Sequence, residues 1–68
     1  MPSYIIRVYD RSQPRRVLSS IPFDAATDLQ AERALSDHWN EKRLGAAPGR
    51  WRSKLYRHGD NRPMITIE

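Results

Sequence analysis

Hydrophobic and polar residues alternate along most of the chain, and one stretch near the middle breaks the alternation. In residues 4–9 (YIIRVY) Tyr4, Ile6 and Val8 alternate with a second set, Ile5, Arg7 and Tyr9, which is typical of a strand with one buried face. The turn-forming run DRSQPR, residues 10–15, separates them from a second β-rich run, VLSSIPF. The runs WRSKLYR and PMITIE flank HGDN in the same way. The pattern therefore predicts two β-hairpins.

Between the hairpins, residues 23–45 carry the only helical periodicity in the chain. Thr27 followed by Gln30 fits a capping box at the start of a helix, and Gly45 is the expected residue at its C-terminal cap. At 100° per residue one stripe of this helix is apolar and is expected to cover the sheet. Its members are Ala31, Ala34, Leu35, His38 and Trp39.

The element order is ββαββ, and we predict one α+β domain over residues 1–68. It would have a four-stranded antiparallel or mixed sheet with the helix packed on one face; the pattern leaves the strand order open. The face under the helix is expected to hold Tyr4, Ile6, Val8, Trp51, Leu55, Ile65 and Ile67. The open face would then hold Ile5, Arg7, Tyr9, Arg52, Lys54, Tyr56, Met64 and Thr66. Ile21 and Phe23 differ in parity from Leu18, which predicts a β-bulge near Ser19 and Ser20.

Charge is distributed unevenly along these elements. Lys and Arg number 12 against 8 Asp and Glu, a net charge of +4, and the bases concentrate in the two hairpins, while the helical segment is mildly acidic. This polarity would give one side of the molecule an attractive field for anions. The chain has no cysteine, which excludes disulfides and thiolate zinc sites. No apolar run approaches the roughly 20 residues of a membrane span, and the expected location is the cytoplasm.

The open face has the chemistry of a binding surface. Both hairpins place a base and a tyrosine two residues apart, Arg7 with Tyr9 and Lys54 with Tyr56. Bases neutralise phosphates and aromatic rings stack on nucleobases, so we predict a non-enzymatic module that engages nucleic acid or a nucleoprotein. The candidate contact residues are Arg7, Tyr9, Arg11, Arg15, Arg16, Arg52, Lys54, Tyr56, Arg57 and Arg62.

Other interpretations of the same face stay open. An acidic protein surface would suit it equally. Plain solvation is a further interpretation, because bases and tyrosines also protect sheets and form cross-strand cation–π pairs. A second copy of the chain, joined through open faces or edge strands, is a further candidate partner. We expect no membrane partner.

Catalytic signals are sparse. His58 in the turn would be the candidate general acid or base of a small ribonuclease-like site, and His38 with Glu41 supplies only two metal ligands. The sequence shows no glycine-rich phosphate loop and no nucleophile elbow. We predict that the chain is not an enzyme and binds no cofactor and no metal.

The element order resembles that of small phage and mobile-element proteins, the anti-CRISPR proteins. The similarity rests on YIIRV at the start, AATDLQAERALS in the helix and KLYRHGDNRPMITI in the last hairpin. It implies an inhibitor that binds a CRISPR effector complex without catalysis. The net positive charge departs from the acidic, DNA-mimicking members, so the implied target is an acidic protein surface or the rim of a nucleic-acid channel.

Overall fold

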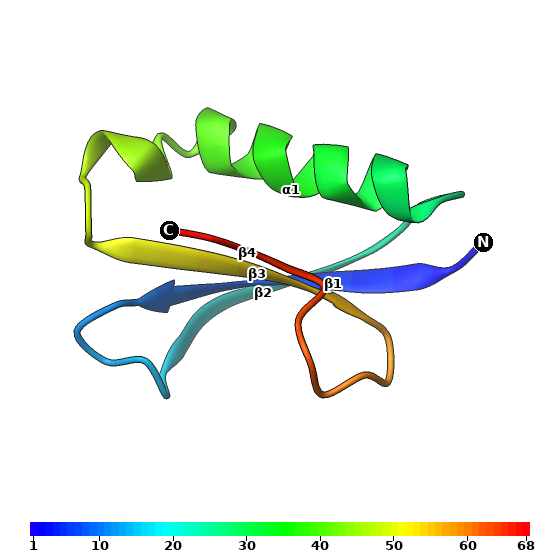
Figure 1. The fold of residues 1–68 in the computed structure, drawn as a ribbon, viewed down its shortest axis with the longest axis horizontal. Helices are drawn as coiled ribbons and strands as arrows, with labels where there is room; N and C mark the ends of the chain where they lie inside the picture. The colour runs from blue at the N-terminus through cyan, green and yellow to red at the C-terminus, as the bar shows by residue number, and fades with distance from the viewer.

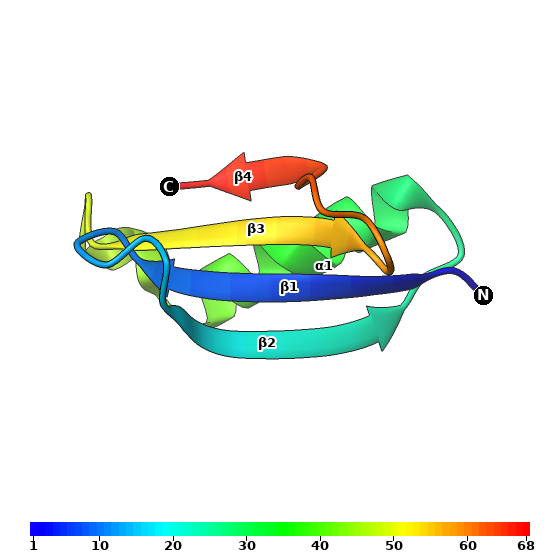
Figure 2. The same ribbon diagram turned by 90° about the horizontal axis from the view of Figure 1, so that it is seen from below.

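A computed structural model describes residues 1–68 and contains one sheet with one helix above it (Figure 1). The strands are β1 (Ser3–Asp10), β2 (Val17–Asp24), β3 (Trp51–Arg57) and β4 (Ile65–Ile67). Helix α1 (Asp28–Glu41) and a short 3-10 turn, η1 (Leu44–Ala46), lie between the hairpins. All neighbouring strands are antiparallel, in the order β2-β1-β3-β4 (Figure 2). The ββαββ fold is therefore confirmed, with the first strand of each hairpin at the centre of the sheet.

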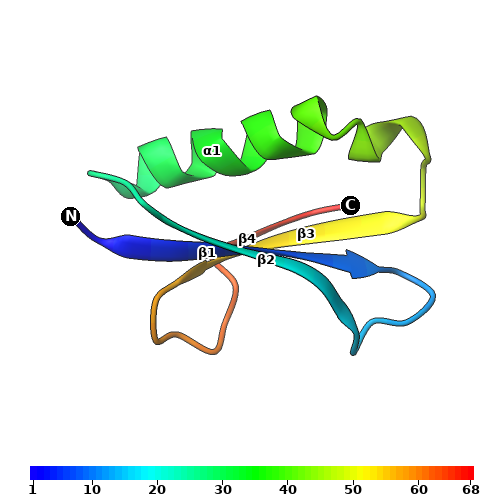
Figure 3. The ribbon, with the colours of Figure 1, turned by 180° about the vertical axis from the view of Figure 1, so that it is seen from behind.

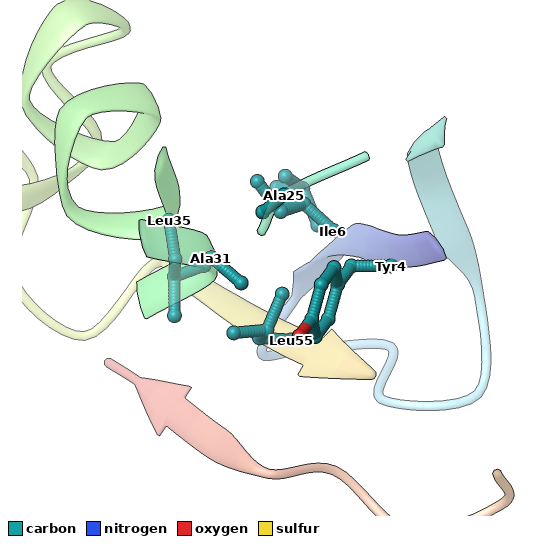
Figure 4. Close-up of a cluster of buried hydrophobic side chains, with 7 residues drawn as sticks. Tyr4, Ile6, Ala25, Ala31, Leu35 and Leu55 are labelled. Atoms are coloured by element: carbon teal, nitrogen blue, oxygen red, sulfur yellow. The ribbon is translucent and has the colours of Figure 1, made fainter. Parts of the chain in front are cut away.

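The core fills the space between α1 and one face of the sheet, as the alternation predicts. Ile6 of β1 lies opposite Leu55 of β3, and both are buried beneath Ala31 and Leu35 of the helix (Figure 4). Tyr4 closes the same cluster at the end where the helix begins. The expected assignment of β1, β3 and β4 residues to the covered face is confirmed, and this apolar contact is the main source of stability in so small a domain.

The start of α1 follows the predicted cap, but its end does not. The backbone amide of Gln30 donates to the Thr27 hydroxyl at 3.2 Å. The helix ends at Glu41, and Arg43 adopts the left-handed conformation, with φ 53°. Gly45 is therefore not the cap, and that prediction was wrong. Gly45 instead leaves room for an indole, because a Cβ there would stand 2.9 Å from Nε1 of Trp39.

Arg43 offers a direct test of this helix end. A left-handed residue with a Cβ is strained, so Arg43→Gly should raise the free energy of unfolding by about 0.5–1 kcal/mol. The matched control is Arg33→Gly inside α1, which should lower it by about 1 kcal/mol. Urea unfolding of both variants gives the two values. Two changes of the same sign would contradict the assigned conformation.

One side-chain assignment needs correction, and the predicted bulge in β2 is present. Met64 precedes β4, and its side chain packs against the core cluster instead of lying on the open face. Its amide donates to the carbonyl of Leu55 at 2.7 Å, which fixes the loop close to β3. The bulge in β2 falls at Leu18, because Val8 pairs with Ser19 while Tyr9 pairs with Val17. It is adjacent to Ser19, which confirms the predicted bulge near Ser19 and Ser20.

The two hairpin loops lie on the side of the sheet that faces away from the helix (Figure 3). Residues 11–16 connect β1 to β2, and residues 58–64 connect β3 to β4. Both loops bend below the sheet and flank its open face (Figures 1 and 3). The model contains no helix with the length and apolar character that crossing a membrane requires.

Candidate functional site on the open face of the sheet

Two bases stand side by side at the centre of the open face. Arg7 of β1 and Lys54 of β3 are direct cross-strand partners, a position where like charges repel. Each base lies over the tyrosine on the opposite strand: the Arg7 guanidinium carbon is 4.9 Å from the Tyr56 ring centroid, and Lys54 Nζ is 5.2 Å from that of Tyr9. We call these four residues the central cluster. Its crossed cation–π pairs offset the repulsion between the two bases.

The tyrosines of the central cluster are buried although they face away from the helix. Tyr9 is 8% exposed and Tyr56 7%, and their hydroxyl oxygens are 3.3 Å apart. Burial, followed by the hydrogen bond with Tyr56, raises the pKa of the Tyr9 hydroxyl. Rings so little exposed offer no platform for nucleobases. Their contribution is to hold the two bases in place on the surface of the sheet.

Arg52 and Arg11 extend the basic row toward one end of the sheet, and both contact the carboxylate of Glu68. Arg52 Nη2 lies 2.6 Å from Glu68 Oε2, and Arg11 Nε lies 3.5 Å from the same oxygen. The hydrogen bond from Arg52 lowers the pKa of Glu68. Glu68 is not among the predicted site residues. It has the same parity as Thr66, which pairs with Lys54, and this parity places it beside Arg52. One carboxylate thus balances two arginines at this end.

The loops add three further bases. Arg15 and Arg16 belong to the first loop and Arg62 to the second, and all three are exposed. None of them forms an ion pair within the chain. A hollow of about 460 Å³ in the first loop is lined by only four of its residues, Gln13, Pro14, Arg15 and Arg16. The loops therefore present free charge on the same side of the molecule as the central cluster.

Arg57 is the one candidate residue that the structure places away from this face. It lies in register with Tyr4 on the helix side, and its guanidinium binds the carboxylate of Asp28 at the start of α1. The Tyr4 hydroxyl donates to the same carboxylate at 2.7 Å. Arg57 therefore ties the sheet to the first turn of the helix.

This ion pair predicts how stability depends on pH. The hydrogen bond from Arg57, and after it the one from Tyr4, lowers the pKa of Asp28 below its ordinary value of 3.8. A carboxyl whose pKa is lowered in the folded state stabilises the protein at any pH above its ordinary, unfolded-state pKa. This contribution disappears as the pH falls through the folded-state pKa. Asp28→Asn should therefore lower stability at neutral pH and reduce the further loss on acidification.

Urea unfolding near neutrality and in the acid range measures both effects. Asp37→Asn is the matched control, because Asp37 is exposed on the same helix and forms no ion pair. An Asp28→Asn variant that loses as much stability on acidification as the wild type would contradict the role given to the pair.

The histidines do not assemble a reactive site. His58 is exposed in the second loop, and His38 is half-buried on the helix stripe, where its Nδ1 has no hydrogen-bond partner. No group of three or more His, Cys, Asp or Glu residues is arranged to hold a metal ion. The distinctive chemistry of the molecule is therefore the positive charge of its open face.

Comparison of the chain with models of protein families, with curated proteins and with solved structures found no significant match.

Proposed function

We propose that this chain is a non-enzymatic nucleic-acid-binding module that contacts phosphates with the open face of its sheet, alone or within a nucleoprotein. One observation carries the proposal: five bases on one side of the molecule have no carboxylate partner. They are Arg7, Lys54, Arg15, Arg16 and Arg62. Phosphate contacts of this kind release counterions and supply affinity without reading sequence.

The central cluster supports this proposal through preorganisation. Arg7 and Lys54 rest on the rings of Tyr56 and Tyr9, which limits the conformations of two long side chains before any ligand arrives. Less side-chain entropy is then lost on binding. Helix α1 carries four acidic residues against one base, Arg33, so a polyanion would approach the opposite side of the molecule.

A titration over a salt series tests the proposal. The association constant is measured by fluorescence anisotropy with labelled single- and double-stranded oligonucleotides. Its logarithm should fall linearly with the logarithm of the salt concentration. Each phosphate contact contributes about 0.7–0.9 to the magnitude of this slope, so contacts by several of the five bases should give a slope several times as large. Binding that is undetectable at low salt, or that is insensitive to salt, would contradict the proposal.

An acidic protein surface is the second candidate partner, and the buried tyrosines favour it. A charge-complementary protein surface needs no stacking platform, whereas single-stranded nucleic acid commonly uses one. The resemblance to anti-CRISPR proteins belongs to this version, with a CRISPR effector complex as the target. It predicts a complex recovered from host lysate that survives nuclease treatment. Recovery of only nuclease-sensitive material would contradict it.

A further inference from the structure

A cavity of about 180 Å³ lies at the end of the sheet where helix α1 gives way to η1. Trp39 at the end of the helix and Trp51 at the start of β3 both line it, and they are the only two tryptophans of the chain. Gly45 also lines it and lets the Trp39 indole approach the backbone. Both indoles are half-exposed, in contrast to the buried tyrosines of the central cluster. Two partly exposed indoles thus meet at this cavity.

The cavity lies on the helix side of the sheet and meets the basic row at the end of the sheet. Arg11 and Glu68 form part of its wall, and the same two side chains form the ionic group with Arg52 on the open face. The guanidinium of Arg50 lies 4.8 Å from the Trp51 ring centroid and adds positive charge next to this indole. A strand held by its phosphates along the open face would reach the mouth of this cavity by passing round the end of the sheet at Arg11 and Glu68.

The size and lining of the cavity define what it would hold. Sites for drug-sized ligands begin at about 300 Å³, so this cavity fits a single flat ring system and not a whole nucleotide. Indole walls favour stacking, while a carboxylate and a guanidinium at the rim offer an acceptor and a donor to the edge of a ring. We infer that the cavity takes one unpaired nucleobase of a strand bound on the open face. This inference rests on the proposed function and adds a preference for unpaired nucleic acid.

The two tryptophans provide a direct readout. Titration of the protein with a short single-stranded oligodeoxynucleotide should quench its tryptophan emission, whereas an abasic strand of the same length should not. The strand with bases should also bind about tenfold more tightly than the abasic strand, because one stacking contact supplies a gain of that order. The two strands carry the same number of phosphates, so contacts with the basic face cancel in the comparison.

Two variants localise the effect. Trp51→Leu removes one wall of the cavity, and Ala47→Leu fills it from the loop while both indoles stay in place. Each should abolish the tenfold preference and leave the affinity for the abasic strand unchanged. Circular dichroism shows whether each variant is folded. If the Trp51→Leu variant is unfolded, the Ala47→Leu variant decides the outcome.

The outcomes separate this inference from the proposed function. Salt-dependent binding of equal strength to both strands, without quenching, would overturn the cavity's role and leave phosphate binding intact. A tenfold preference that persists in a folded Ala47→Leu variant would also overturn it. If neither strand binds at low salt, both the proposed function and the inference fail.

Discussion

Replacing Arg7 and Lys54 together by glutamine is expected to weaken nucleic-acid binding by tenfold or more at low salt and to reduce the salt slope by about two. Both bases stand on the open face without a carboxylate partner, so their charge is available to phosphates. Glutamine keeps a polar side chain but removes the charge and, with it, the cation–π contacts with Tyr56 and Tyr9. The measurement is an anisotropy titration of the variant and the wild type over the same salt series.

Arg33→Gln with Lys42→Gln is the matched control, since it removes the same charge from exposed positions of the helical segment. We expect it to change affinity only slightly, through the net charge. If both double variants weaken binding equally, net charge and not the open face would determine the affinity, and the assignment of the site would fail. The folded fraction of each variant is checked by urea unfolding, because loss of two cation–π pairs costs roughly 1–2 kcal/mol.

Leu55→Ala is expected to remove a large part of the protein's stability at 25 °C. Leu55 is 0% exposed and lies at the centre of the contact between β3 and the helix. Truncation of a buried leucine costs about 2–5 kcal/mol. A domain of this size has about 3–10 kcal/mol of total stability, so the urea midpoint should fall markedly. Circular dichroism and urea unfolding measure the effect.

Leu29→Ala makes the same substitution on the helix at a position that is 63% exposed. It should change the free energy of unfolding by no more than about 0.5 kcal/mol. A comparable loss in both variants would show that the helix does not pack on the sheet through the face described.

Alternation and turn chemistry predicted most of the fold. The parity of β1 placed Tyr4, Ile6 and Val8 under the helix and Arg7 and Tyr9 on the open face, as the strand register confirms. Strand order was beyond the sequence, because either strand of a hairpin with this pattern can occupy the centre of a sheet. Met64 was misplaced because its parity matches Thr66, while the chain enters β4 only at Ile65.

The candidate site was predicted in composition but not in conformation. Parity indicates on which face of the sheet a tyrosine lies. It does not show whether the ring is exposed to solvent or covered by a neighbouring base. Arg7 covers Tyr56 and Lys54 covers Tyr9 because the register sets them diagonally across two strands. The pairing of Arg57 with Asp28 likewise joins residues far apart in the sequence. Such contacts depend on the assembled fold, which local patterns do not encode.

Chemical-shift mapping tests the central claim most directly, that the open face is the binding surface. A ¹⁵N-labelled sample titrated with a short oligonucleotide at low salt should show its largest amide shifts in β1, β3 and the two loops, around Arg7, Lys54, Arg16 and Arg62. The amides of Glu32, Asp37 and Glu41 on the outward side of α1 should stay nearly unchanged. Shifts concentrated on the helix, or no shifts at all, would contradict the account.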